Sequence, residues 1–165
     1  MNAPHARIVN AASRRTVLAT GVALLMAAHL PASAKAMFAE VWKDANCGCC
    51  KDWVSHLEAN GFKVKVNDTG NEAMRKRLGV DAKYGSCHTA LIGGYAIEGH
   101  VPAREIVRLL KEKPSAVGLS VPGMPVGSPG MDGKIYGSRQ DPYNVMLLAK
   151  NGGATVYRRY QGSKS

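Results

Sequence analysis

The chain has 165 residues and carries 22 Lys and Arg residues against 12 Asp and Glu residues, a formal net charge of +10 at pH 7. From residue 35 onward the basic excess is scattered, with residues 75–77 and 158–159 as its only clusters, and no stripe of interleaved basic and aromatic residues occurs. Proteins that bind single-stranded nucleic acid use such a stripe, so the composition argues against a nucleic-acid partner. The length beyond residue 36 suits one domain with a modest core.

The first 36 residues predict an export signal rather than part of a folded domain. Basic residues precede an apolar run at residues 17–30 and small residues follow it, which is the order found in secretory signals. The run is shorter than a typical membrane-spanning helix, so no stable membrane insertion is expected after cleavage behind Ala34 or Ala36. Residues 13–18, Ser-Arg-Arg-Thr-Val-Leu, resemble a twin-arginine signal, with an ordinary secretory signal as the alternative. Either signal predicts an exported protein.

Three of the four cysteines lie within four residues, at Cys47, Cys49 and Cys50. Alternating apolar residues at 38–43 predict a strand before them, and a helical pattern at 51–60 predicts a helix after them. At such a strand-to-helix turn, the helix N-terminus stabilises an anion and so favours the thiolate form of a cysteine. A thiolate is both the nucleophile of disulfide exchange and a ligand for soft metal ions. Cys50 continues an apolar stripe of this helix and is expected to lie inward, whereas Cys49 is expected to point elsewhere.

The following elements alternate between strands and helices. The patterns predict a strand at residues 62–66, a short helix at 72–78, a hairpin of strands at 90–92 and 95–98, and a helix that begins at Pro102. The core-facing residues predicted for this last helix are Ile106, Val107, Leu109 and Leu110. This order, with thiols at the first strand-to-helix turn, resembles the thioredoxin-like fold over residues 38–113. We therefore expect an α/β protein with a three-layer, thioredoxin-like arrangement.

Cys87 and His88 stand where a thioredoxin-like fold often has a proline, in the segment that enters its third strand. In that fold the segment lies against the thiol turn, so we expect Cys87 to approach the cysteine cluster. His88 is expected to point to the opposite side if the strand has begun there. A fourth cysteine and a histidine in place of the proline indicate a ligand site more than a plain disulfide exchanger.

A Pro- and Gly-rich stretch at residues 118–131 predicts a loop, since such residues disfavour a helix or a central strand. Pro-Gly-Met occurs twice in it and ends at Met124 and Met131. A thioether is a ligand that Cu(I) prefers, and the alternative is that both methionines fill gaps over apolar surface. Residues 143–160 predict a C-terminal β-hairpin that extends the sheet.

The candidate metal ligands combine soft sulfur donors with imidazole. They are Cys47, Cys49, Cys50, Cys87, His88, His100, Met124 and Met131. Structural disulfides are an alternative for an exported protein, but with Cys87 alone outside the cluster a second bridge would have to be local. A structural zinc site usually has two separated C-x-x-C pairs, and an iron–sulfur site would not need the methionines. His56 lies too far along the predicted helix from Cys49 to share one metal ion with it.

Four motifs resemble those of the CopG-type bacterial copper-resistance proteins. They occupy residues 47–53, 87–90, 98–102 and 121–131, and with them the resemblance covers nearly the whole chain after the signal. The resemblance implies one thioredoxin-like domain at residues 37–162 that holds Cu(I) through cysteine sulfurs and has room for a multinuclear, thiolate-bridged cluster. The expected partners are copper ions and other periplasmic copper-handling or efflux proteins.

The sequence therefore predicts a periplasmic copper-binding protein that sequesters copper, with oxidation or reduction of copper as a further capacity. The alternative is a thiol-disulfide oxidoreductase that uses Cys47 and Cys50 without metal. A third hypothesis is a chaperone that hands copper to a partner, and the sequence does not separate it from storage.

Overall fold

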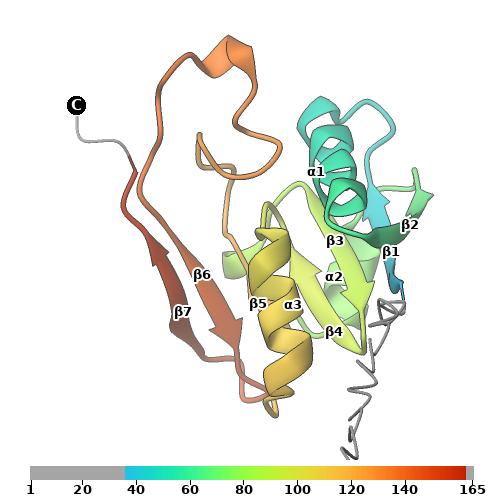
Figure 1. Ribbon diagram of the computed structural model, residues 1–165. Helices are drawn as coiled ribbons and strands as arrows, with labels where there is room; N and C mark the ends of the chain where they lie inside the picture. Colours follow the sequence, from blue (N-terminus) through green and yellow to red (C-terminus); the bar gives the residue numbers. More distant parts are fainter. Residues whose placement is uncertain (1–35, 163–165) are drawn as a thin grey trace, which may run out of the picture. The chain divides into compact units, whose positions relative to one another are not determined.

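A computed structural model describes residues 36–162 (Figure 1). The strands are β1 (Met37–Lys43), β2 (Phe62–Asn67), β3 (His88–Ile92), β4 (Tyr95–Glu98), β5 (Gly118–Ser120), β6 (Tyr143–Leu148) and β7 (Ala154–Tyr160). The helices are α1 (Gly48–Ala59), α2 (Glu72–Arg77) and α3 (Ala103–Glu112), with short 3-10 turns η1 (Ala82–Tyr84) and η2 (Lys134–Tyr136). The predicted export signal lies outside the described residues, except for its last residue, Ala36.

All seven strands form one mixed sheet in the order β2-β1-β3-β4-β5-β6-β7. Two pairs of neighbouring strands are parallel, β1 with β2 and β4 with β5. The other four pairs, including β1 with β3, are antiparallel. The chain is thus a mixed α/β protein, as the sequence predicts. Within residues 36–162 we find no helix with the length and apolar character needed to cross a membrane.

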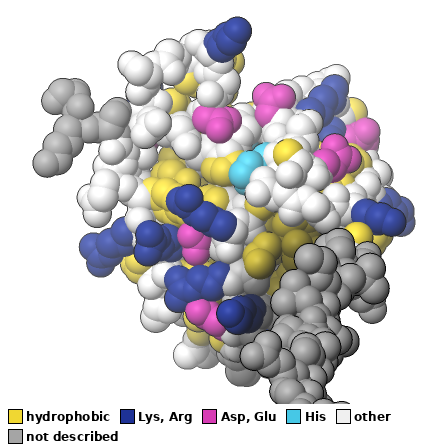
Figure 2. Space-filling model, in the orientation of Figure 1, with side chains coloured by type: hydrophobic (Ala, Val, Ile, Leu, Met, Phe, Trp, Pro, Cys, Tyr) yellow, Lys and Arg dark blue, Asp and Glu magenta, His cyan; other side chains and the backbone are white. Residues whose placement is uncertain are grey.

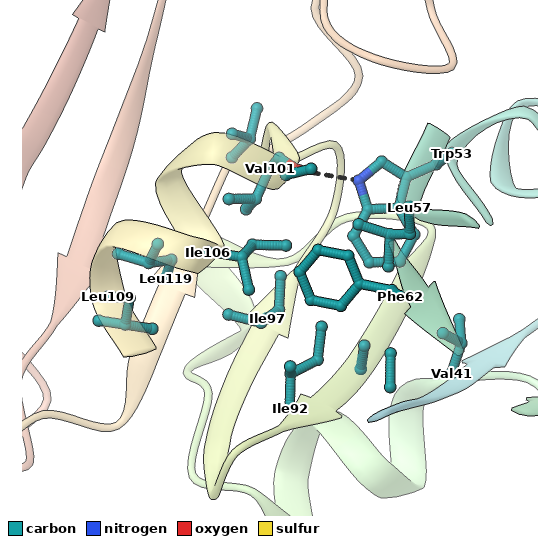
Figure 3. Packing of buried hydrophobic residues seen from close by; sticks show 14 of the residues in the cluster. Val41, Trp53, Leu57, Phe62, Ile92, Ile97, Val101, Ile106, Leu109 and Leu119 are labelled. Atoms are coloured by element: carbon teal, nitrogen blue, oxygen red, sulfur yellow. Dashed lines mark hydrogen bonds between the residues drawn. The ribbon is translucent and has the colours of Figure 1, made fainter. Parts of the chain in front are cut away.

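The two longer helices, α1 and α3, cover one face of the sheet, and α2 lies against the other (Figure 1). The alternation predicted for the first strand is present, since Ala39 and Val41 are buried and Glu40 between them is partly exposed. Side chains from α1, α3 and the central strands share one core (Figure 3). Its largest apolar members are Trp53, Leu57, Phe62, Ile92, Ile97, Ile106, Leu109 and Leu119.

The predicted C-terminal hairpin, β6 and β7, extends the sheet beyond β5. The loop predicted at residues 118–131 is wrong at its start, because Gly118–Ser120 form β5, a central strand between β4 and β6. These residues precede the first proline, so their N–H groups remain able to join the sheet, and Leu119 and Ser120 are fully buried. The proline-based exclusion of a strand therefore holds only from Pro122 onward.

Helix α3 packs its apolar stripe on the sheet, with one predicted core residue misplaced. Ile106 and Leu109 are fully buried, whereas Val107 is 41% exposed. Neighbouring residues of an α-helix point about 100° apart, so Val107 faces solvent when Ile106 faces the core. Glu105 is buried although the sequence pattern does not place it in the core. Its carboxylate accepts a hydrogen bond from the Tyr160 hydroxyl at 2.8 Å. This contact ties the C-terminal hairpin to α3.

Lysine and arginine side chains are spread over the face seen in Figure 2 and alternate with acidic ones instead of gathering in one patch. Several basic side chains of the described residues form ion pairs, among them Arg108 with Glu112 at 2.7 Å and Arg139 with Asp141 at 2.9 Å. The basic excess is therefore distributed over separate elements on this face.

Gly118→Ala should destabilise the protein, because the added Cβ would meet the main-chain carbonyl carbon of Ala96 in β4 at 2.6 Å. Main-chain atoms of a central strand cannot move aside, so we expect a loss of roughly 1–3 kcal/mol in the free energy of unfolding. Urea unfolding checks this against Gly133→Ala, where the new Cβ would have nothing within 4 Å. Equal midpoints for the two variants would contradict the packing described for β5.

Candidate metal centre

The turn between β1 and α1 presents three cysteine sulfurs at the start of a helix. Cys47 is the N-cap in an extended conformation, and its carbonyl accepts the N–H of Lys51 at 3.3 Å. Cys49 and Cys50 follow within the first turn of α1, so the helix begins three residues before the predicted Lys51. The predicted strand-to-helix turn is present, with its thiols near the positive end of the helix dipole.

Cys87 reaches this turn because of the register between β1 and β3. These strands are antiparallel and pair Lys43 with His88, so the residue before β3 lies beside the residue after β1. The Sγ atom of Cys87 lies 3.4 Å from that of Cys50 and 3.8 Å from that of Cys49. All four cysteine sulfurs, including that of Cys47, fall within 4.8 Å of one another. The sheet thus joins a thiol from a distant loop to the cluster.

Cys47 and Cys50 are joined by a disulfide, and Cys49 and Cys87 are free thiols. The bridge is local, and it uses the C-x-x-C pair of the oxidoreductase hypothesis. Cys50 is fully buried, as expected. The expectation that Cys49 points elsewhere is wrong, because its Sγ lies 3.6 Å from that of Cys47. In this state two of the four sulfurs are available as thiols.

His100 presents an unprotonated ring nitrogen to Cys87. Its Nδ1 lies 2.9 Å from the Pro129 carbonyl oxygen, which can only accept a hydrogen bond, so Nδ1 carries the proton. Nε2 is therefore a lone-pair donor, and it lies 3.2 Å from the Cys87 sulfur. A backbone carbonyl that fixes the tautomer in this way is the usual support of a metal-binding histidine. His100 is oriented as a ligand before any ion arrives.

His88 is completely buried beside the same sulfur. Its Nδ1 lies 3.5 Å from Cys87 Sγ, and its ring packs against Trp53 at 4.2 Å between centroids. The sequence predicts that the side chains of Cys87 and His88 point to opposite sides if both lie in the strand. This condition is not met, because β3 begins at His88 and Cys87 precedes it. Among residues 36–162, His88 Nε2 is the buried side-chain nitrogen or oxygen without a hydrogen-bond partner.

Burial shapes the charge state of the site. It raises the pKa of the Cys87 thiol to about 12, and the neighbouring Cys49 adds to this shift. It lowers the pKa of His100 below its ordinary value and that of His88 well below it, with repulsion from His100 as a second cause for His88. Both imidazoles are therefore neutral near pH 7, which is the form that binds metal ions.

The loop at residues 121–131, which we call the methionine loop, lies against the cysteine turn, but its two thioethers are placed differently. Gly130 packs so closely on α1 that a Cβ there would meet the Cys49 carbonyl oxygen at 2.5 Å. Met131 is buried, and its sulfur accepts the Tyr136 hydroxyl proton at 3.4 Å. Met124 is 52% exposed. The structure brings the loop to the site, and the role of either thioether as a ligand remains a prediction.

Several residues that support the site were not predicted from the sequence. Trp53 donates from Nε1 to the Val101 carbonyl at 2.9 Å and forms one wall of the His88 site. Pro129 acts only through its backbone carbonyl, which no side-chain motif could reveal.

His56 is separate from the cluster, as expected, and its Nε2 accepts the Ala103 N–H at the start of α3 at 3.0 Å.

The donors that converge are therefore four sulfurs and two neutral imidazoles. They form two overlapping groups that share Cys87, one with the other cysteines and one with His88 and His100. Thiolate sulfur selects soft ions, and imidazole suits several transition metals. The donor set thus fits a thiophilic metal ion, and the disulfide in the same cluster fits thiol exchange.

Comparisons with known proteins identify the family. The family model described as a protein of unknown function, DUF411, matches residues 84–131. A search of the curated proteins found no match. Two solved structures titled copper resistance protein copG are both 51% identical to the chain. Form 2 has a TM-score of 0.70, with 76% of this chain and 99% of that chain covered. Form 1 has a TM-score of 0.71, with 78% and 100% covered. This chain therefore belongs to the CopG family of copper resistance proteins.

Proposed function

We propose that the protein binds Cu(I) through its clustered cysteines and so contributes to copper resistance. The observation that carries this proposal is the convergence of four cysteine sulfurs within 4.8 Å, one of them delivered by a separate loop. The similar structures are titled copper resistance proteins, which points to copper as the cargo of this donor set. Thiolates stabilise Cu(I) and bind hard divalent ions poorly, so the donors and the family agree.

More than one copper ion fits this cluster. A thiolate sulfur has several lone pairs and bridges two ions, so four sulfurs hold several Cu(I) ions more naturally than one isolated ion. His100 Nε2 adds a lone pair next to Cys87, at 3.2 Å from its sulfur. Met124 and Met131 are proposed as further ligands on the loop that packs against Cys49. A cluster of this kind also allows a change of copper oxidation state.

We infer a periplasmic location and a thioredoxin-like arrangement for the same protein. The location rests on the export-signal pattern of residues 1–36. The arrangement is supported by the parallel β1–α1–β2 unit, with cysteines at its strand-to-helix turn, followed by the β3–β4 hairpin and α3. Transfer of copper to periplasmic copper-handling or efflux proteins is the partner proposal that belongs with this location.

Cys87→Ser should weaken Cu(I) binding, because a hydroxyl oxygen is a poor ligand for a soft ion. Removing a group that only supports a metal ligand lowers metal affinity by roughly tenfold or more. Removing a ligand itself should lower the Cu(I) affinity by at least that factor. Anaerobic titration of the fully reduced protein against a competing Cu(I) chelator measures it, with Met146→Leu in β6 as a control that should bind normally. Failure of the unaltered, reduced protein to take up Cu(I) would refute the proposed function.

The redox state of the Cys47–Cys50 pair should set the copper capacity. With the disulfide intact, Cys49 and Cys87 are the free thiols, and reduction by an added dithiol supplies two more sulfurs. We therefore expect the reduced protein to bind more Cu(I) per chain than the oxidised protein in parallel anaerobic titrations. Equal capacity in both states would mean that Cys47 and Cys50 are not ligands.

The disulfide also favours a second candidate function, thiol-disulfide exchange without metal. Cys47 and Cys50 are bonded at the start of α1, and the Cys87 sulfur lies 3.4 Å from that of Cys50. If exchange is the function, the metal-free, reduced protein should reduce a disulfide substrate, measured with a chromogenic disulfide. Cys47→Ser should then abolish turnover and Met124→Ala should preserve it. Absence of turnover in the metal-free protein would eliminate this candidate.

A further inference from the structure

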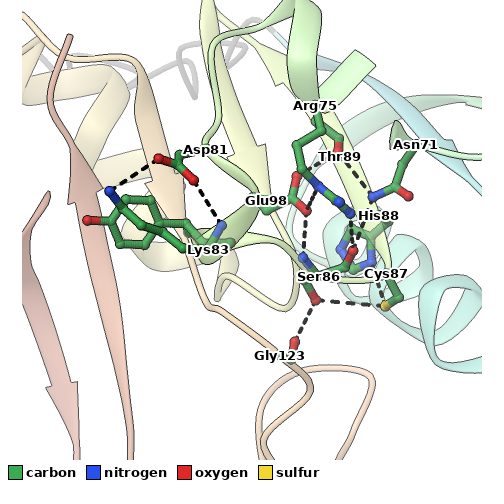
Figure 4. Close-up of polar contacts among 12 residues, drawn as sticks. Asn71, Arg75, Asp81, Lys83, Ser86, Cys87, His88, Thr89, Glu98 and Gly123 are labelled. Carbon is green, nitrogen blue, oxygen red and sulfur yellow. Dashed lines mark hydrogen bonds and ion pairs between the residues drawn. The ribbon is translucent and has the colours of Figure 1, made fainter. Parts of the chain in front are cut away.

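The short segment that carries Cys87 is held through every polar group of the residue before it (Figure 4). The Ser86 N–H donates to Glu98 Oε1 at 2.7 Å, and the Ser86 carbonyl accepts from Arg75 Nη2 and from Asn71 Nδ2. The Ser86 hydroxyl donates to the Gly123 carbonyl at 2.5 Å. Ser86 is thus fixed from α2, from β4 and from the methionine loop at once.

Two of these partners form a largely buried ion pair with each other. Arg75 Nε lies 2.8 Å from Glu98 Oε1, and the Glu98 side chain is completely buried. Thr89, the first residue after His88 in β3, donates its hydroxyl proton to Glu98 Oε2 at 2.6 Å. The carboxylate therefore receives hydrogen bonds from Arg75, from Ser86 and from Thr89. These contacts bracket Cys87 and His88 on both sides along the chain.

The ion pair is expensive to bury, so stability alone is a weak reason for its presence. Two desolvated charges seldom add more to stability than apolar residues of the same volume would. Their better-attested effect is to select one arrangement among several. The guanidinium is planar and offers its donors in a fixed fork, which lets Arg75 contact Glu98 and the Ser86 carbonyl together. The pair therefore restricts the backbone at Ser86 more than a single hydrogen bond would.

We propose that Arg75 and Glu98 are positioning residues that hold the Cys87 sulfur against the Cys47–Cys50 turn. Cys87 follows Ser86 directly and precedes the regular strand, so the β-ladder alone does not fix it. The ion pair supplies the missing constraint by fixing the N–H and the carbonyl of Ser86. For copper binding this inference rests on the proposed function, but the placement of the sulfur is a property of the metal-free chain.

Cross-linking of two thiols tests this placement without metal. In a chain with Cys47→Ser and Cys49→Ser, the remaining thiols are Cys50 and Cys87, whose sulfurs lie 3.4 Å apart. After complete reduction, diamide takes up the two electrons and two protons released as the Cys50–Cys87 bond forms. The rate is followed by alkylation of unreacted thiols and mass spectrometry. This rate reports how often the two sulfurs meet.

Arg75→Met combined with Glu98→Leu in that chain removes both charges and leaves neither one buried alone. We expect the cross-linking rate to fall roughly tenfold or more, since displacement of a reacting group by about 1 Å is that costly. Lys65→Met is the matched control: it breaks the exposed Lys65–Glu40 pair, also 2.8 Å long, and should leave the rate unchanged. Circular dichroism is used to check that each variant is folded.

Arg75→Lys provides the second variant, because it keeps the charge but cannot reach Glu98 and the Ser86 carbonyl together. It should fold and still cross-link more slowly than the parent chain. A parental rate in either folded variant would overturn the positioning role, even if the protein binds copper. Slowed cross-linking supports the role whether or not copper binds, so a failed copper titration would count against the proposed function alone.

Discussion

The approach of the Cys87 segment to the N-terminus of α1 is the contact on which the candidate site depends. It follows from the antiparallel pairing of β1 with β3, which sets His88 opposite Lys43 and so places the residue before β3 next to the cysteine turn. A shift of one residue in this register would send the side chains of β3 to the opposite face of the sheet. The buried apolar positions of both strands, Ala90 opposite Val41 and Ile92 opposite Ala39, resist such a shift. Packing of the hydrophobic core thus brings the Cys87 segment to the cysteine turn, and the hydrogen bonds of Ser86 then restrict the position of the sulfur.

The two histidines beside the thiols are neutral, and the ring of His100 is oriented with a free lone pair toward the cluster. The Pro129 carbonyl fixes the proton of His100 on Nδ1, and the ring nitrogen that remains faces Cys87. His88 is enclosed by Trp53 and has an unpartnered nitrogen, a cost that a purely structural core would avoid. These features are costly for folding and useful for binding, and they occur together at one place. A metal-binding function gives a common reason for them.

Much of the fold could be predicted from the sequence because it depends on patterns of residues that are close together in the chain. The alternation in β1, the stripe of α1 and the Gly-Gly turn between β3 and β4 each depend on residues close in sequence. The errors arose where tertiary contacts decide: β5 is a strand only because β4 and β6 flank it, and Cys49 turns toward Cys47. The approach of Cys87 to the cluster was expected from the resemblance to a known fold. The Arg75–Glu98 pair and the Pro129 carbonyl had no recognisable pattern, since their partners are brought together only by the folded chain.

The proposed binding of a soft ion to the sulfur cluster can be tested by X-ray absorption at the copper edge. The measurement uses protein that is reduced, loaded with Cu(I) under anaerobic conditions and freed of unbound metal. We expect an edge typical of Cu(I) and a nearest shell dominated by sulfur, with a copper–copper distance if the cluster is multinuclear. A nearest shell made of nitrogen and oxygen alone would contradict the claim, because the copper would then lie outside the four cysteines.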